Sequence, residues 1–236
     1  MVPEKQIQDF VSRLRAAAGG NLESVVLYGS AASGEFHPEF SNINLLCILQ
    51  EVSYVSLSTI AATVEWWTRQ KYHPPLVLTR QELLRAADVF CIELLDMKER
   101  HRVLCGDDPL SVLEVPLQLH RAQLEYELRE KLILLRENLL LVRGQDKQQW
   151  ELMLHSISTF ATLFRHVLIV MGGAAPKTKR ETIQTLATRI SFDPSPLLQL
   201  LDIREHKAER KQFDVKEVFA RYLEAVQHVI AAVDTM

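Results

Sequence analysis

The most restrictive feature of this sequence is a pair of apolar segments near the N-terminus, separated by a stretch that contains glycine and proline. The first segment, residues 24–28, ends at Gly29 and Ser30, and the second opens with Asn42 and Asn44. Apolar, β-branched runs bounded by such residues are typical of two strands joined by a turn. A glycine at the end of a buried strand lets the backbone turn sharply or approach a ligand closely.

This spacing resembles the signature of the nucleotidyltransferase superfamily, the polymerase-beta-like fold that includes aminoglycoside adenylyltransferases. That signature is a hydrophobic strand, Gly-Ser or Gly-Gly, roughly ten residues, and Asp-x-Asp on the next strand. Gly29 and Ser30 match its first part, whereas Asn42 and Asn44 stand at both aspartate positions. The resemblance covers about residues 20–110. It implies an α/β (α+β) nucleotidyltransferase-like domain with a mixed sheet.

In that family the Gly-Ser loop holds nucleotide phosphates, and the aspartate pair binds two magnesium ions that bridge them. The resemblance therefore implies a nucleotide- or phosphate-binding site at Gly29, Ser30, Ser41, Asn42 and Asn44. Because the two asparagines alternate with apolar residues, we expect both amides on one face of a strand.

The asparagines change what such a site can do. An amide offers Mg²⁺ a carbonyl oxygen but no charge, and at about 4 Å and an effective dielectric near 20 each lost charge pair is worth on the order of 4 kcal/mol. The expected third strand, residues 76–79, also brings no carboxylate, since Leu76 or Val77 occupies the relevant position. We expect no catalytic residues, no metal ligands and no cofactor. The interpretation is a catalytically inactive pseudoenzyme that binds nucleotide or phosphate, or acts as a regulatory module.

Two other functions fit the sequence. An active metal-dependent nucleotidyltransferase, transferring NMP from an NTP to a small-molecule or protein acceptor, would need Glu82, Glu93, Asp96 or Asp107 in unusual places. Asp107 is expected in a loop, because its neighbour Asp108 points the opposite way in any strand and a proline follows. Alternatively, the chain is a helical interaction protein whose small α/β domain serves packing or dimerisation.

After Pro116 the pattern changes to long amphipathic helices. Apolar residues recur every three or four positions from Leu124 to Val142 and again from Trp150 to Met171. Thr178 with Glu181 has the spacing of a helix-capping box. We therefore expect a nucleotidyltransferase-like domain over 1–112 followed by an all-α helical bundle domain over 113–236.

Composition limits the environment and the partners. The 236 residues carry a formal net charge of −3, so no overall field attracts nucleic acid or an anionic membrane. The cysteines, Cys47, Cys91 and Cys105, lack metal-ligand spacing and are expected to be reduced. No apolar run approaches the roughly 18 residues of a membrane span, and no leader pattern begins the chain. These features predict a cytoplasmic protein.

The partners compatible with this interpretation are a nucleotide or phosphorylated ligand, a protein bound through the helical domain, and a second copy of the chain. Neither nucleic acid nor a membrane is expected. His155 and His166 share one expected helix but lie about 16 Å apart along it, too far to share a metal ion. A basic cluster around Lys177 and Arg210 is interspersed with acidic residues and is expected to be a solvated face.

Overall fold

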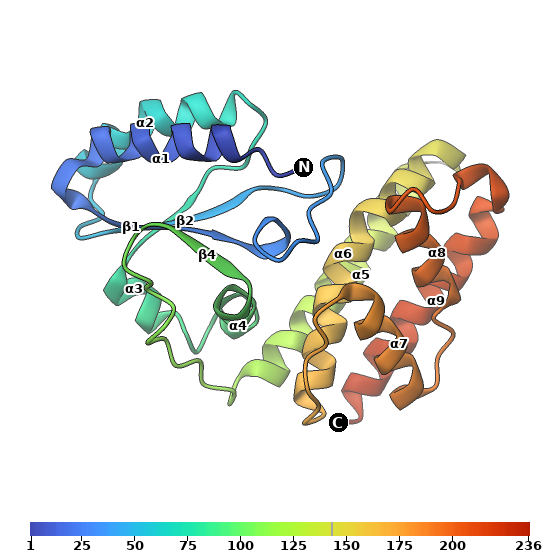
Figure 1. Cartoon of the computed structure of the whole chain (residues 1–236). Helices are drawn as coiled ribbons and strands as arrows, with labels where there is room; N and C mark the ends of the chain where they lie inside the picture. The colour runs from blue at the N-terminus through green and yellow to red at the C-terminus, as the bar shows by residue number, and fades with distance from the viewer. Residues whose placement is uncertain (143) are drawn as a thin grey trace. The chain divides into compact units, whose positions relative to one another are not determined.

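The computed structural model describes residues 1–142 and 144–236, which divide into two compact units, Met1–Leu119 and His120–Met236. Figure 1 shows a sheet covered by helices in the first unit and helices alone in the second. The fold class predicted from the sequence, an α/β domain with a mixed sheet followed by a helical bundle, is confirmed. The first unit extends to Leu119, beyond the boundary expected at residue 112.

The first unit contains alternating helices and strands. Their bounds are α1 Glu4–Ala18, β1 Leu22–Tyr28, β2 Asn44–Leu49, α2 Tyr54–Thr68, β3 Leu76–Thr79, α3 Arg80–Arg85, α4 Cys91–Glu99 and β4 His101–Gly106, with a 3₁₀ turn η1 at Gly19–Asn21 and another, η2, at Gly29–Ala31. Within the described residues the strands form one sheet in the order β3-β2-β1-β4. β1 pairs antiparallel with β2 and β4, whereas β2 and β3 run parallel.

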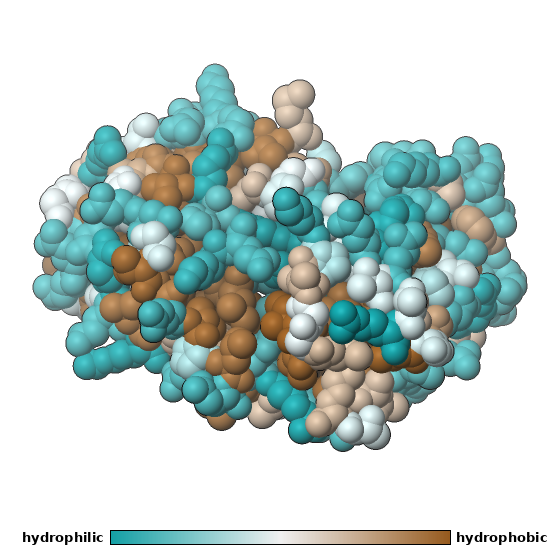
Figure 2. Space-filling model, turned by 60° about the horizontal axis from the view of Figure 1, so that its bottom comes forward, coloured by the Kyte–Doolittle hydropathy of each residue, from teal (hydrophilic) through white to brown (hydrophobic). Residues whose placement is uncertain are grey.

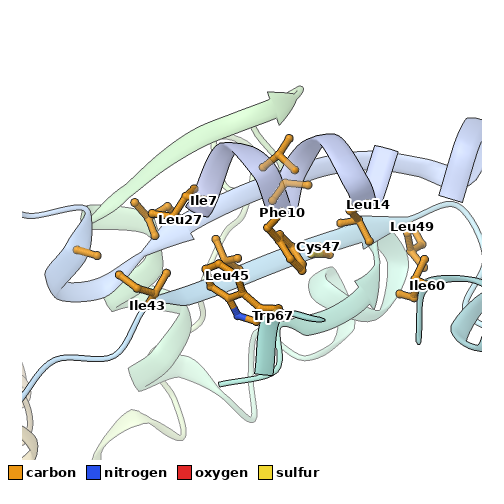
Figure 3. Close-up of a cluster of buried hydrophobic side chains, with 13 residues drawn as sticks. Ile7, Phe10, Leu14, Leu27, Ile43, Leu45, Cys47, Leu49, Ile60 and Trp67 are labelled. Atoms are coloured by element: carbon orange, nitrogen blue, oxygen red, sulfur yellow. The ribbon is translucent and has the colours of Figure 1, made fainter. Parts of the chain in front are cut away.

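Successive side chains along β1 and β2 point to opposite faces of the sheet, and an apolar core lies on each face. Val25 and Leu27 point to the α1 and α2 side, where Phe10 and Trp67 pack with ring centroids 4.9 Å apart (Figure 3). Val26 points to the other face, which α3, α4 and the segment after β4 cover. A strand that is buried on both faces consists of consecutive apolar residues, which is why the sequence of residues 24–28 predicts a buried strand.

Local sequence explains where several elements begin and end. Ser53 caps α2, and Thr79 caps α3 through a reciprocal box with Glu82. The segment 90–106, which the periodicity alone does not assign, is a helix followed by a strand. β4 ends at Gly106, where φ is +75° and an added Cβ would lie 1.8 Å from the carbonyl oxygen of Glu23. Only glycine fits this close approach of β4 to β1.

The second unit is a bundle around one central helix. Its elements are α5 His120–Leu141, α6 Asp146–Val170, α7 Lys179–Ile190, α8 Ser195–Arg204, a 3₁₀ turn η3 at Arg210–Gln212, and α9 Val215–Asp234. Helix α6 contacts α5, α7, α8 and α9. Thr178 and Asp214 cap α7 and α9 as their sequence positions predict.

Helix α6 corrects one expectation from the sequence. It is long and apolar enough to cross a membrane by length and composition, although no such segment was anticipated. In the bundle 61% of its most apolar window is buried. A helix surrounded by other helices is apolar on most sides, so its composition follows from its central position.

Two histidines form a buried contact in this bundle. Nε2 of His120, at the start of α5, lies 2.8 Å from Nδ1 of His166 in α6, and the rings meet edge to face. His166 is fully buried and His120 is 2% exposed. Burial, and to a smaller extent the neighbouring imidazole, lowers the pKa of His120 to about 4. His166 therefore pairs with a residue 46 positions away rather than with His155.

Hydrophobic side chains are exposed on the first unit near α3 and α4. Figure 2 brings this face forward and shows apolar residues gathered there. Leu84, Val89 and Phe90 are each about half exposed. Leu84 belongs to α3, and Val89 and Phe90 lie between α3 and α4.

The His120 contact predicts a pH dependence of stability. Because the folded-state pKa lies below the ordinary value of 6.5, the folded bundle favours the neutral ring and the unfolded chain binds the proton more tightly. The contribution is fully present above pH 6.5 and is lost as the pH falls towards 4, by about 3 kcal/mol in all. Urea denaturation between pH 4 and 7.5 would measure it.

The variant His120→Gln is expected to flatten this part of the pH profile. Replacing the exposed His155 by Gln should leave the slope as in the wild type, and so provides the matched control. Equal slopes in wild type and His120→Gln would contradict the assignment.

Candidate functional site

The glycine predicted from the sequence lies at the end of the central strand. β1 ends at Tyr28, and Gly29 follows with φ of +76°, in the left-handed region that favours glycine. Its N–H donates to the carbonyl of Arg100 over 3.0 Å, which ties the turn to the start of β4. The 3₁₀ turn η2 begins here, and the carbonyl of Gly29 accepts from the N–H groups of Ala32 and Ser33.

A row of polar side chains crosses the sheet beside this turn. Tyr28 pairs in register with Asn44 on β2 and with His101 on β4. Residues paired across strands share a face, and the face that holds Tyr28 is the one covered by α3 and α4. The structure thus brings Asn44, Tyr28 and His101 side by side at the end of the sheet where Gly29 lies.

Gly29 and Asn44 are in direct proximity. A Cβ added at Gly29 would lie 3.2 Å from Nδ2 of Asn44, closer than ordinary van der Waals contact. The end of β1 and the start of β2 therefore meet at these two residues. Ser30 lies within the same turn, where its carbonyl accepts a long hydrogen bond of 3.4 Å from the Ser33 hydroxyl.

The other two predicted site residues lie in the segment before β2. The Ser41 hydroxyl accepts from the N–H of His37 at 2.9 Å, and the Ser41 N–H donates to the His37 carbonyl at 2.8 Å. β2 begins only at Asn44, opposite the last residue of β1, so Asn42 is exposed and outside the ladder. The expectation that Asn42 and Asn44 share one strand face was therefore wrong, because β1 offers no pairing partner beyond Tyr28.

Two basic side chains flank the turn, and each lies close to a carboxylate. Arg100 lies 3.3 Å from Glu35. His101 places Nε2 3.1 Å from a carboxylate oxygen of Asp108 and Nδ1 3.1 Å from the carbonyl of Lys98. Both contacts of the imidazole are with oxygen atoms, one of a carboxylate and one of a backbone carbonyl.

The electrostatics keep these groups in defined charge states. Burial would raise the pKa of Asp108, but hydrogen bonds from the Leu110 N–H and from His101 outweigh it and lower that pKa. Burial raises the pKa of Tyr28, and the negative charge of Glu93 adds to this effect, followed by Cys47. The Tyr28 phenol is consequently neutral at physiological pH. It can donate one hydrogen bond into the site.

The carboxylates considered as substitute ligands are dispersed. Glu82 caps α3, where bonds from Thr79 hold it. The backbone of Asp107 accepts from Ser24, which is at the opposite end of β1 from Gly29. Glu93 and Asp96 are both on α4, and the charge of Glu93 reaches Tyr28. Of these carboxylates, Glu93 is the one whose charge contributes to the raised pKa of Tyr28.

The donors at this end of the sheet do not fit a pair of magnesium ions. Asn42 and Asn44 carry neutral amides where the signature described above has aspartates, and the Asn44 amide lies beside Gly29. β3 adds no ligand, since Leu76 pairs with Leu46 on the same face as Asn44. In residues 1–142 and 144–236, no three His, Cys, Asp or Glu side chains converge as a metal site.

Among solved structures, the chain resembles spectinomycin adenyltransferase AAD(9) from Enterococcus faecialis, determined with ATP and spectinomycin. The TM-score is 0.58 at 13% sequence identity, and the match covers 95% of this chain and 99% of that one. The fold is that of a nucleotidyltransferase. No protein-family model matches the chain, and no curated protein matches it. At this identity the likeness establishes the nucleotidyltransferase fold and leaves the chemistry to be argued from the residues.

Several residues beside the nucleotidyltransferase-type turn were not singled out from the sequence. Tyr28 could have been predicted as a site residue from the sequence, since it is the polar last residue of a buried strand just before Gly29. His101 and Asp108 carried none, because their pairing depends on how the chain returns after β4. Arg100 and Glu35 are 65 residues apart and meet only through the sheet order.

The proximity of Gly29 to Asn44 predicts a specific cost for adding a methyl group. Both Gly29→Ala and Gly34→Ala place alanine at positive φ, which costs about 1–2 kcal/mol. Only Gly29 has a neighbour within contact distance, whereas nothing lies within 4 Å of the Cβ position at Gly34. We expect Gly29→Ala to lose about 1 kcal/mol more than Gly34→Ala in urea denaturation.

The double variant Gly29→Ala, Asn44→Ala tests the origin of that excess. Without the Asn44 amide, the alanine at position 29 should no longer cause the additional loss of unfolding free energy. Only the cost of alanine at positive φ, which Gly34→Ala shares, should remain. Equal losses in the two single variants would show that the Asn44 amide does not constrain the turn.

Proposed function

We propose that this protein is a catalytically inactive member of the nucleotidyltransferase fold that binds a nucleotide or another phosphorylated molecule without a metal pair. The observation that carries the proposal is the meeting of Gly29 with the neutral amide of Asn44 at the end of β1. The position that supplies a metal-binding carboxylate in the family signature supplies here only hydrogen bonds.

The neighbouring residues support an uncharged, hydrogen-bonding site. The neutral Tyr28 phenol lies between Asn44 and His101, and the Ser30 side chain belongs to the adjoining turn. An anion at this position would find hydroxyl, amide and imidazole groups within one row. Arg100 and His101 already contact Glu35 and Asp108, so an incoming phosphate must compete with those carboxylates.

A cytoplasmic location and a protein partner bound through the helical unit remain part of the proposal. The similar adenyltransferase structure was determined with ATP and spectinomycin. By analogy, a nucleotide is the first ligand to test on this chain.

Calorimetry with ATP tests the proposal directly. We expect the wild type to bind ATP with an affinity that changes less than about threefold when excess EDTA replaces Mg²⁺. Restoring both carboxylates in Asn42→Asp, Asn44→Asp should make binding depend on Mg²⁺ by tenfold or more, since each charge pair is worth on the order of 4 kcal/mol.

Gln50→Glu is the matched control for that experiment. It adds one negative charge at the exposed far end of β2 and should leave the response to Mg²⁺ unchanged. Strong Mg²⁺ dependence of ATP binding in the wild type would contradict the proposed function, and no ATP binding under any condition would exclude ATP as the ligand.

A second candidate function rests on Glu93. Its charge contributes to the raised pKa of Tyr28 from α4, which makes an active adenylyltransferase of unusual design the defined alternative. The proposal above predicts no transfer of radiolabelled AMP from ATP to any acceptor. Transfer that Glu93→Gln lowers about 100-fold or more, and that Glu99→Gln on the same helix leaves intact, would establish the enzyme instead.

A further inference from the structure

A pocket in the second unit lies where α6 and α9 begin, beside the 3₁₀ turn η3. Its volume is about 320 Å³, and five of its eight lining residues are charged. These residues are Asp146 and Trp150 from α6, Arg210 and Lys211 from η3, and Phe213, Asp214, Val215 and Lys216 in and just before α9. All of them belong to the same compact unit. We call this cavity the α6–α9 pocket.

Trp150 brings an unused hydrogen-bond donor to this pocket. The residue is only 6% exposed, and a buried indole N–H usually has a hydrogen-bond partner. Here the N–H donates to no acceptor in the described part of the chain, yet it is open to solvent rather than sealed in the core. Trp150 lines the pocket, so the acceptor for its N–H must come from solvent or from a molecule bound there.

The start of α6 adds backbone donors to the same wall. Its N-cap residue, Gln145, makes no side-chain cap, and the N–H groups of residues 146–148 have no acceptor among residues 1–142 and 144–236. At the start of α9, by contrast, the Asp214 carboxylate accepts two N–H groups at 2.9 Å each. The α6 end therefore keeps the free N–H groups and the partial positive charge that attract anions to helix N-termini.

The charged side chains of the lining give the pocket an excess of positive charge. Three are basic and two are acidic, namely Arg210, Lys211, Lys216, Asp146 and Asp214. Lys211 is paired with Glu209 at 2.6 Å, and Asp214 is engaged as the cap of α9. Within the described residues, neither Arg210 nor Lys216 forms an ion pair, and Arg210 is half-buried. The sequence suggested a solvated face around Arg210, whereas the structure places its side chain in a pocket wall.

We propose that the α6–α9 pocket binds the phosphate group of a small phosphate monoester. Such a group offers three acceptor oxygens and a charge near −2. The Arg210 guanidinium, the Trp150 N–H and the first N–H groups of α6 surround one cavity and can donate to these oxygens together. A carboxylate, with two oxygens and a single charge, would leave some of these donors unused.

The size of the pocket favours a monoester over a free phosphate ion. Its volume of about 320 Å³ is roughly ten times that of one water molecule in the liquid, so a phosphate leaves room for the group esterified to it. Phe213 and Val215 supply the apolar wall for that group. The residues of this pocket differ from those of the polar row in the first unit, so the two sites can be tested separately.

Fluorine NMR of the full chain labelled with 5-fluorotryptophan tests this site. Of the three tryptophans, Trp66 and Trp67 are both in α2 of the first unit, and the variant Trp150→Phe identifies the resonance of Trp150. At constant ionic strength, inorganic phosphate should shift that resonance saturably, with a Kd of about 1 mM or lower. Phenyl phosphate should bind about threefold tighter or more, because its ring gains apolar contact.

Two variants should change the affinity for phenyl phosphate in opposite directions. Arg210→Gln should weaken binding about tenfold or more, because it removes a charge-assisted hydrogen bond. Asp146→Asn should tighten it about threefold, because it removes a repelling charge from the pocket wall. Arg136→Gln removes an exposed arginine of α5 that does not line the pocket and should bind as the wild type does.

Three results would overturn the proposal. The first is a Trp150 resonance that phenyl phosphate does not shift. The second is an Arg210→Gln variant, shown by circular dichroism to be folded, that binds phenyl phosphate as tightly as the wild type. The third is an affinity for acetate equal to that for phenyl phosphate, since the pocket would then show no preference for a phosphate group.

Discussion

The first unit depends on β1 being hydrogen-bonded along both edges and covered on both faces. Val25 and Leu27 serve one core and Val26 the other, so a single strand joins the two layers of helix. Neither edge can slip, because a shift of one residue would exchange every buried side chain between the cores. The position of Gly29, and with it the candidate site, is fixed by the end of this strand.

That constraint explains how much of the molecule the sequence could predict. The apolar run before Gly29 and the amphipathic periods after Pro116 are consequences of burial, and burial leaves a local pattern in the sequence. Helix caps at Thr178 and Asp214 are equally local. These features are sufficient to anticipate the α/β unit, the helical unit and the proximity of Gly29 to the second strand.

Other features depend on contacts that no local pattern records. Asn42 looked like a strand residue because it alternates with Ile43 and Asn44, yet β2 can begin only where β1 provides a partner. The contacts between His120 and His166 and between His101 and Asp108 arise from the return path of the chain. α6 combines the composition of a membrane span with a central place in a bundle, and only the neighbouring helices distinguish the two.

The residues that determine this fold and those that would determine its chemistry are separate sets. Asn44 is half-buried at the first position of β2, where an amide or a carboxylate completes the same backbone pairing with Tyr28. An exchange of one for the other therefore changes the charge of the site while leaving the cores on both faces of the sheet intact. This separation is why a fold can be recognised at 13% identity while the residues of the candidate site differ in charge. In the function proposed above, Asn44 beside Gly29 and Tyr28 is the decisive position, because a single unit of charge there separates a surface suited to anions from one suited to cations.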